Sequence, residues 1–401
     1  SVGYQWLTVI EFEVTRSLLD RAGKMAAIEG LDDTLRRMYE FLAAIIRPDR
    51  SFPQLNDGFI LWDATKLGDV AAERGWEDIA YVASAGASGR EPGFCSRSYP
   101  NAGLHIMRSD WSTHAQYLVM DTGPYGGPHG HEDKLSFELS AHGARFVVDP
   151  GSYTNDKNDP DRNYFVGSQG HNTLLVDDCS QVRRWTPAHM VPAVADVEHG
   201  TWLSDAGMDV AGGRYDESYA RLAITGPGEA PIISDVSHER VIVFARPDYW
   251  VIEDSIACRD AHDFTFLFHL APDVVVIDLA PGSAVVRSER NGAMLLFRVF
   301  ADEVIQSEVL DGWYSEDHYR KCSAPVLSFK VEQTSSSRFT WLLYPLPAGA
   351  NADQVSARFE PDTDAGHRRL LVRSDARSDY VKLPHDSSGI SRAEGYKITT
   401  V

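Results

Sequence analysis

The hydrophobic positions of the first 90 residues recur at the spacing of helices. Apolar side chains stand three or four residues apart over 7–18, and again over 35–45. Side chains at this interval share one face of a helix, so two helices are predicted here. Asp32 or Asp33 is a suitable N-cap for the second. Two shorter helices are expected at 64–73 and 76–83.

Beyond Ser98 the pattern changes to short β-rich runs separated by Gly, Pro, Asn and Asp. Many short strands with turn signals between them predict a sandwich of antiparallel sheets. The stretch 83–93, rich in Gly, Ala and Ser, is a good linker. The expected fold class is therefore an α+β multidomain protein, with a helical domain at 1–90 and a large β domain at 91–401. The expected strands are 103–108, 116–121, 135–140, 145–149, 173–176, 240–244, 249–253, 264–270, 294–299, 326–331 and 339–344.

Composition narrows the class of partner. The chain has 58 acidic and 38 basic side chains and a formal net charge of −20. This charge argues against broad binding to nucleic acid or to an anionic membrane surface, but it allows a local basic cleft. No run approaches 18 apolar residues, so no transmembrane helix is expected. The four cysteines form no C-x-x-C pair, which favours buried free thiols over a zinc knuckle.

Three residues form a candidate metal site. His131, Asp149 and His171 lie 18 and 22 residues apart, on or beside separate predicted strands. Zinc accepts two imidazoles and one carboxylate together with a fourth ligand. Neighbouring strands of one sheet could bring the three together. The spacing is equally compatible with hydrogen-bonded or surface polar residues.

Four further residues could carry chemistry. His129 follows a glycine-rich loop and shares a strand face with His131, so it is a candidate general base. Arg162 offers a planar fork for a carboxylate, and Tyr164 could transfer a proton. Tyr4 flanks the apolar stripe of the first helix. A loop histidine and packed or silent tyrosines are the competing interpretations.

Several words of the sequence match one known family. They are H-G-H-E-D-K-L-S-F, V-D-P-G-S-Y, R-N-Y-F and G-H-N-T-L-L-V-D, supported by R-P-D-Y-W-V-I-E-D, F-H-L-A-P and G-W-Y-S-E-D-H-Y. On these words the chain resembles the heparinase II/III-like polysaccharide lyases, which include oligo-alginate lyases and heparin or heparan sulfate lyases. The likeness extends over nearly the whole chain.

The resemblance implies a fold and a reaction. The expected fold is an incomplete (α/α) toroid followed by stacked antiparallel sheets, with the active site between them. The expected reaction is β-elimination at a uronic-acid glycosidic bond, which leaves an unsaturated uronate. Family zinc ligands fall on His131, Asp149 and His171, where the zinc more plausibly holds the loops than activates water.

The resemblance also assigns catalytic and binding residues. Its catalytic histidine falls on His129, a second tyrosine falls on Tyr164, and the toroid tyrosine that serves as acid/base falls on Tyr4. An acidic polysaccharide or oligosaccharide is the expected partner. The expected lining of a basic, aromatic cleft is Arg162, Lys134, Arg183, Arg184 and Trp185.

One departure from the family concerns the beginning of the chain. Family members carry an Asn or His pair upstream of the toroid tyrosine, and nothing precedes Ser1. We therefore expect a fragment, with the other part of the toroid present as a separate piece, or an impaired protein. A periplasmic or secreted location is expected, or a cytoplasmic one for an oligosaccharide-specific enzyme.

Two other functions compete with a lyase. A zinc-dependent hydrolase would use the same His131, Asp149 and His171 cluster to activate water. A non-catalytic carbohydrate-binding relative would keep the fold without turnover. Only elimination creates a double bond that absorbs ultraviolet light. The K-L-S-F ending of the histidine motif slightly favours alginate-like, unsulfated uronates as the substrate.

Overall fold

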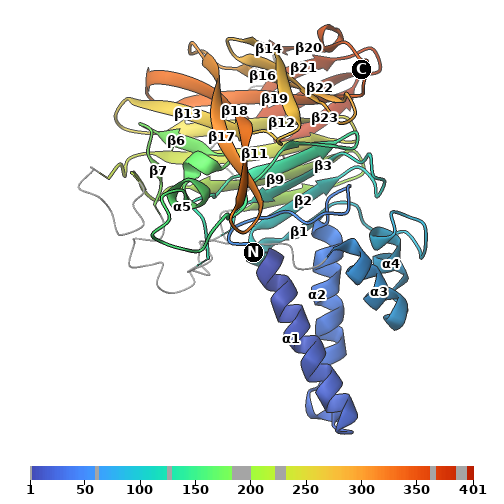
Figure 1. The fold of residues 1–401 in the computed structure, drawn as a ribbon. Coiled ribbons are helices and arrows are strands. Elements are labelled where there is room, and N and C mark those ends of the chain that lie inside the picture. The colour runs from blue at the N-terminus through green and yellow to red at the C-terminus, as the bar shows by residue number, and fades with distance from the viewer. Residues whose placement is uncertain are drawn as a thin grey trace.

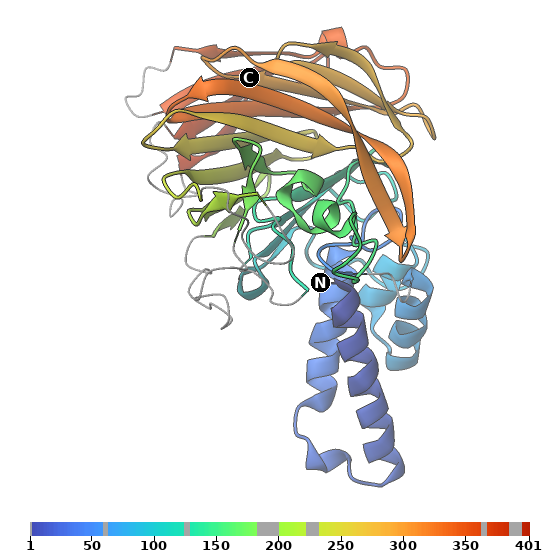
Figure 2. The same ribbon diagram turned by 60° about the vertical axis from the view of Figure 1, so that its left-hand side comes forward.

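The computed structural model describes residues 2–58, 63–123, 129–182, 200–221, 232–361, 367–384 and 395–401. A slender helical part projects from a large body of antiparallel sheets (Figures 1 and 2). The mostly β composition and the helices-first order confirm the predicted class at this level. No helix within the described ranges is long and apolar enough to cross a membrane.

The helical part consists of two helix pairs. The helices are α1 (Val2–Arg21), α2 (Leu31–Ile45), α3 (Ala64–Arg74) and α4 (Glu77–Ala83). Trp6 of α1 anchors the first pair, because its ring lies edge-on to Tyr39 of α2 at 6.3 Å and to Phe52 at 5.5 Å. The helices predicted from apolar spacing are confirmed to within a few residues.

The predicted cap of α2 is wrong. The N-cap is Gly30, which has a left-handed backbone and no side-chain hydrogen bond. Asp32 and Asp33 lie in the first turn instead, where their charge still favours the positive end of the helix dipole. A side-chain cap does occur on α3, where Asp63 accepts hydrogen bonds from two backbone amides.

Within the described residues, five sheets form the β body. The first sheet pairs β1 to β5 in sequence order, and the large sheet runs β14-β15-β16-β19-β12-β11-β9-β8. The covering sheet runs β17-β18-β13-β6, the C-terminal sheet runs β20-β21-β22-β23, and β7 pairs with β10. Short helix α5 (Arg162–Val166) lies between β5 and β6.

The strands have the following bounds. In the first sheet they are β1 (Arg97–Tyr99), β2 (Leu104–Arg108), β3 (Tyr117–Asp121), β4 (Phe137–Ala141) and β5 (Ala144–Val147). In the large sheet they are β8 (Thr201–Ser204), β9 (Met208–Tyr215), β11 (Ser237–Ala245), β12 (Tyr249–Ala257), β14 (Val274–Ala280), β15 (Ser283–Ser288), β16 (Met294–Phe300) and β19 (Ser337–Leu346). In the covering sheet and the small pair they are β6 (Leu174–Val176), β13 (His262–His269), β17 (Gln306–Asp317), β18 (Arg320–Thr334), β7 (Ser180–Gln181) and β10 (Tyr219–Ala220). In the C-terminal sheet they are β20 (Ser356–Glu360), β21 (His367–Arg373), β22 (Ser378–Pro384) and β23 (Lys397–Thr400).

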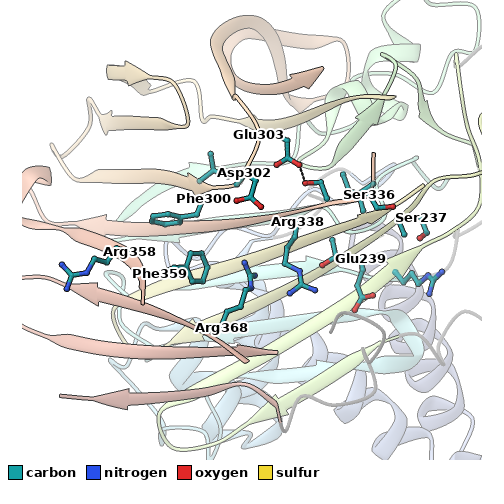
Figure 3. Close-up of a pocket in the computed structure, with 17 residues that line it drawn as sticks. Ser237, Glu239, Phe300, Asp302, Glu303, Ser336, Arg338, Arg358, Phe359 and Arg368 are labelled. Carbon is teal, nitrogen blue, oxygen red and sulfur yellow. Dashed lines mark hydrogen bonds between the residues drawn. The ribbon is translucent and has the colours of Figure 1, made fainter. Parts of the chain in front are cut away.

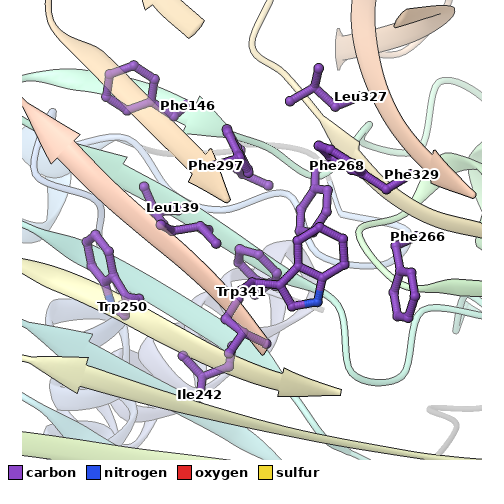
Figure 4. Packing of buried hydrophobic residues seen from close by; sticks show 14 of the residues in the cluster. Leu139, Phe146, Ile242, Trp250, Phe266, Phe268, Phe297, Leu327, Phe329 and Trp341 are labelled. Atoms are coloured by element: carbon purple, nitrogen blue, oxygen red, sulfur yellow. The ribbon is translucent and has the colours of Figure 1, made fainter. Parts of the chain in front are cut away.

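The central strands of the large sheet are buried on both faces. On one face Trp341 packs edge-on to Phe266 at 5.2 Å and near Phe268 at 5.1 Å, which joins this sheet to the covering sheet (Figure 4). On the other face Tyr249 stacks on Tyr344 at 5.5 Å within the core shared with the C-terminal sheet. Successive residues of a strand point to opposite faces, so the same strand contributes side chains to both hydrophobic cores.

A buried ion pair joins the helical part to the first sheet. Arg47, just after α2, donates from Nε and Nη2 to the Glu138 carboxylate of β4 at 2.8 and 2.6 Å. Both side chains are 2% exposed. Burial alone would lower the pKa of Arg47, but Glu138 raises it above its usual range. The Arg47 guanidinium therefore stays ionised, and its contact with Glu138 fixes where the helices meet the sheets.

We predict that Arg47→Met lowers the free energy of unfolding by about 3–5 kcal/mol, because it leaves the Glu138 carboxylate buried without its cation. Denaturant unfolding of the purified protein measures this change. The control is Arg287→Met at the exposed position of β15, which should change stability by less than about 0.5 kcal/mol. Equal effects of the two substitutions would contradict the assigned role of the pair.

Candidate active site

The candidate site is organised around Asp57, a residue that the sequence analysis did not single out. Arg162 Nη1 and Nη2 donate to its two carboxylate oxygens at 2.5 and 2.6 Å. His131 Nε2 lies 2.9 Å from Oδ1, and His129 Nδ1 lies 3.2 Å from Oδ2. Three segments distant in the sequence thus meet at one carboxylate, of which 2% is exposed.

The charge of Asp57 is held by its neighbours. Burial alone would raise the pKa of this carboxyl, but hydrogen bonds and charges of His131 and Arg162 lower it well below its usual range. A bidentate arginine is the strongest partner that a buried carboxylate can have. Asp57 is therefore ionised at neutral pH and supplies a fixed negative charge.

Backbone contacts lock the two histidines to the same loop. Asn56 has a left-handed backbone, with φ of 60°, which asparagine tolerates better than most residues. Its Oδ1 accepts a hydrogen bond from the His131 amide at 3.0 Å, and the Asp57 amide donates to the His129 carbonyl at 3.1 Å. The loop after α2 and the H-G-H segment therefore move as one unit.

The structure places Tyr4 beside His129, as the sequence analysis predicted. The Tyr4 hydroxyl lies 3.2 Å from Nδ1 and 3.1 Å from Nε2, and the ring centroids are 4.5 Å apart. Burial and the Asp57 carboxylate raise the pKa of Tyr4, and Arg162 opposes them. Tyr4 is therefore protonated at neutral pH. Its hydroxyl suits proton donation, whereas a tyrosine that acts as a base needs a lowered pKa.

Two histidines and an aspartate next to this centre could hold a metal ion. Ligand atoms of His131, Asp133 and His171 all lie within 4.8 Å of one another, and all three side chains are buried. Imidazole nitrogens and carboxylate oxygens at this separation are a donor set that zinc accepts. Asp149, the predicted carboxylate ligand, lies 2.9 Å from His171 Nδ1 through Oδ2. Asp133 was not predicted, so two carboxylates compete for this role.

Neighbouring strands hold the loop that carries Asp149. Gly151 has φ of 80°, and an added Cβ would lie 2.2 Å from the Ser315 carbonyl oxygen of β17. The glycine of V-D-P-G-S-Y is therefore required for the close approach of β17. Below the site, Arg240 of β11 donates to the Leu135 and Asn172 carbonyls at 2.9 and 2.6 Å. These bonds fix the backbone just after the H-G-H segment and just after His171.

The remaining predicted residues lie away from an open cleft or outside the described part. The Tyr164 hydroxyl accepts a hydrogen bond from the Trp313 amide of β17 at 3.1 Å, and burial raises its pKa to about 12. These contacts indicate packing, not proton transfer. Lys134 is 2% exposed, so it does not line a cleft, contrary to expectation. Arg162 serves Asp57 instead of a substrate. Arg183, Arg184 and Trp185 lie outside the described residues.

Comparison with known proteins identifies the family. Residues 91–342, more than half of the chain, match the family described as heparinase II/III-like, C-terminal. The chain belongs to this family. Within it, the chain is 22% identical over 365 residues to a heparin-sulfate lyase of Pedobacter heparinus, covering 88% of this chain and 51% of the relative. It is 22% identical over 349 residues to a heparin-sulfate lyase of Bacteroides stercoris, covering 82% and 47%.

Solved structures of this heparinase group share the fold. The heparan sulfate lyase of Pedobacter heparinus superposes with a TM-score of 0.78 at 19% identity, over 96% of this chain and 58% of that one. A structure of heparinase III superposes with a TM-score of 0.75 at 15% identity, over 96% of this chain and 59% of that one. The chain thus spans about half the length of the relatives that it matches.

We predict that Asp57→Asn lowers the free energy of unfolding by about 3–5 kcal/mol. The change keeps the shape of the side chain but leaves the Arg162 guanidinium buried without a counter-charge. Thermal or denaturant unfolding measures the loss. The control is Asp278→Asn on the exposed end of β14, expected within about 0.5 kcal/mol of the parent. A stable Asp57→Asn protein would mean that water, not Asp57, compensates Arg162.

Proposed function

We propose that the protein is a polysaccharide lyase that cleaves an acidic polysaccharide at a uronic-acid linkage by β-elimination. The observation that carries this proposal is the contact between the Tyr4 hydroxyl and His129, backed by the ionised Asp57. An acid and a base within about 3 Å of each other can both reach the adjoining C5 and O4 of one sugar ring. Membership of the heparinase II/III-like family and relatives named heparin-sulfate lyases support the same reaction.

In this proposal each side chain carries out one proton transfer. His129 takes the proton from C5, and the electrons of that bond form the C4–C5 double bond. The C4–O4 bond breaks, and the protonated Tyr4 donates its hydroxyl proton to the departing O4. Asp57, 3.2 Å from His129 Nδ1, stabilises the imidazolium that forms. His129 then returns a proton to the Tyr4 oxygen across the 3.1 Å contact, which restores both groups.

A cavity beside this centre offers room for a sugar. It has a volume of about 540 Å³ and is lined by Asn56 and Asp133 on one side and by Gln5 and Arg37 on the helices. The Asn56 oxygen faces the His131 amide. The Asn56 amide nitrogen and Arg37 are therefore candidates to neutralise the substrate carboxylate, the role first expected of Arg162.

We propose that His131, His171 and one of the two carboxylates, Asp133 or Asp149, hold a zinc ion. A bound zinc would supply cross-linking of the loops that carry His129 and Arg162. Its ligands are 0–3% exposed, and Asp133 also lines the cavity beside the site. A zinc hydrolase would use a coordination position that faces this cavity for its metal-bound water. Ultraviolet absorbance of the products separates the two reactions, because only elimination creates a double bond.

Among acidic polysaccharides, we propose a heparan-sulfate-like glycosaminoglycan. The names of the relatives support this class. The K-L-S-F segment, which favoured alginate, is buried at Lys134 and Ser136 and cannot contact a polymer directly. A panel of uronate polysaccharides, monitored by ultraviolet absorbance, separates the two substrate classes. Faster release of unsaturated ends from alginate would contradict the glycosaminoglycan proposal.

We further propose that α1–α4 are part of an (α/α) toroid. The paired antiparallel helices fit such a ring, and α1 exposes Leu7, Val14 and Leu18 at 37%, 55% and 60%. Apolar side chains in this spacing form one face that another helix could cover. A crystal structure of the complete gene product would test this proposal, and solvent along this face would contradict it.

We predict that Tyr4→Phe and His129→Ala each lower turnover at least about a hundredfold, because each removes one proton-transfer group. Both variants should keep the unfolding midpoint of the parent, since Tyr4 and His129 lie at the exposed edge of the site. Double-bond formation is followed by ultraviolet absorbance. The matched control is Tyr380→Phe, which removes a hydroxyl on the distant C-terminal sheet and should leave turnover unchanged.

Zinc binding makes a separate prediction. Elemental analysis should find about one zinc per chain, and a chelator should lower the melting temperature, because ligand binding to the folded state stabilises it. His171→Ala should abolish binding. Asp133→Asn and Asp149→Asn then identify the third ligand. The variant that loses zinc has lost the ligand, and the variant that retains zinc has lost a carboxylate that does not bind the metal. Full stability after complete zinc removal would contradict the structural role.

A further inference from the structure

A second cavity lies away from the candidate active site, where strand ends of the large sheet meet the C-terminal sheet. Its volume is about 970 Å³, near the upper end of the range for small-molecule sites. Strands β9, β11, β12, β16 and β19 form one side, and β20 and β21 form the other. Figure 3 shows the lining side chains gathered between the two sheets.

Cations collect in this cavity although the chain as a whole is acidic. Arg214, Arg338, Arg358 and Arg368 line it. Arg358 points away from the others, whereas Arg338 and Arg368 extend next to each other (Figure 3). Their guanidinium charges are close enough to interact, because Arg338 helps burial to lower the pKa of Arg368. The cavity therefore contains a pair of neighbouring positive charges.

The two arginines differ in how they are neutralised. Arg368 donates to Glu253 and to the Thr340 hydroxyl, and its guanidinium lies 4.7 Å from the centre of the Phe359 ring. Arg338 donates to the Pro384 carbonyl at 3.1 Å. Among the described residues, no carboxylate forms an ion pair with Arg338. Arg338 therefore shares the charge of Glu253 with Arg368 without contacting it directly, and its guanidinium can bond a ligand.

The rest of the lining suits a sugar better than a uniformly anionic polymer. The Phe300 and Phe359 rings, 5.8 Å apart and perpendicular, offer aromatic surface for the C–H face of a pyranose. Serine hydroxyls and the carboxylates of Glu239 and Glu303 can bond sugar hydroxyls. The same carboxylates would repel a chain with a charge on every unit. A glycosaminoglycan with a carboxylate on every second sugar and hydroxyl groups on the others matches the mixed lining.

We propose that this cavity is a second, non-catalytic binding site for an acidic oligosaccharide, in which Arg338 binds a carboxylate or sulfate group. The choice of ligand rests on the proposed function, since a lyase that holds its polymer at a second point keeps the chain close between cleavages. Holding one polymer at two points raises its effective concentration at each site.

The test measures binding of size-defined heparan sulfate tetrasaccharides by titration calorimetry in the Tyr4→Phe background, which prevents turnover. Two tetrasaccharides per chain are expected. Arg338→Gln should weaken one of the two sites by at least about tenfold, because a charge-assisted bidentate bond is lost. The matched control is Arg373→Gln at the exposed end of β21, which removes the same charge outside the cavity and should leave both sites intact.

Three results would overturn the site. They are unchanged binding by Arg338→Gln, an equal loss in Arg373→Gln, and equally strong competition by an oligoglutamate peptide. The first places the ligand elsewhere, the second reduces the effect to net charge, and the third removes the saccharide specificity. A protein that binds at this cavity but never forms a double bond would refute the proposed lyase and still support the site.

Discussion

The arrangement of the candidate active site depends on the buried carboxylate of Asp57. Burying a charge is costly unless its partners are close and well oriented, and here Arg162 supplies a bidentate bond while His131 supplies a third. The loop after α2, the H-G-H segment and α5 can therefore meet in only one way. The geometry of His129 and Tyr4 follows from this constraint, since the same loop also bonds the His129 backbone.

The same charge also lies next to both groups of the proposed proton transfer. The Asp57 carboxylate is 3.2 Å from His129 Nδ1, within reach of a hydrogen bond. It also raises the pKa of Tyr4, which keeps that hydroxyl protonated. The Asp57 charge thus contacts the proposed base, His129, and keeps the proposed acid, Tyr4, protonated. Because the metal-ligand cluster is buried behind His131, neither of the proposed proton transfers needs the metal.

Much of the fold could be predicted because its signals are local. Apolar spacing located α2, α3 and α4, and β-rich runs located the buried strands such as β12 and β19. Strands β14 and β17 were missed because their side chains are largely exposed and give no apolar run. β9 was missed because M-D-V-A-G-G-R-Y contains two glycines and an aspartate. Burial on both faces by neighbouring sheets, not intrinsic preference, makes β9 a strand.

The residues of the candidate site could be predicted where they belong to a sequence motif, and not elsewhere. The H-G-H and G-H-N words located His129, His131 and His171, but no motif marks Asp57. A signal did exist, since an unpaired arginine fork at Arg162 required a carboxylate. Sequence reasoning assigned that carboxylate to the substrate, and the protein supplies its own. Lys134 was wrongly expected to line the cleft, because a charged residue inside a motif was assumed to be exposed.

An acidic protein can bind an acidic polymer only where local contacts outweigh its overall charge. With a net charge of −20, distant repulsion is screened beyond about 8 Å at physiological salt, so the nearest side chains decide. At the catalytic centre Arg162 is already neutralised by Asp57, which leaves less attraction there than the sequence suggested. At the second cavity, Arg338 forms no ion pair with a carboxylate of the described residues. Under the proposed function, attraction for the polymer would thus be separated from catalysis, and weak binding at the reacting sugar would permit release after each elimination.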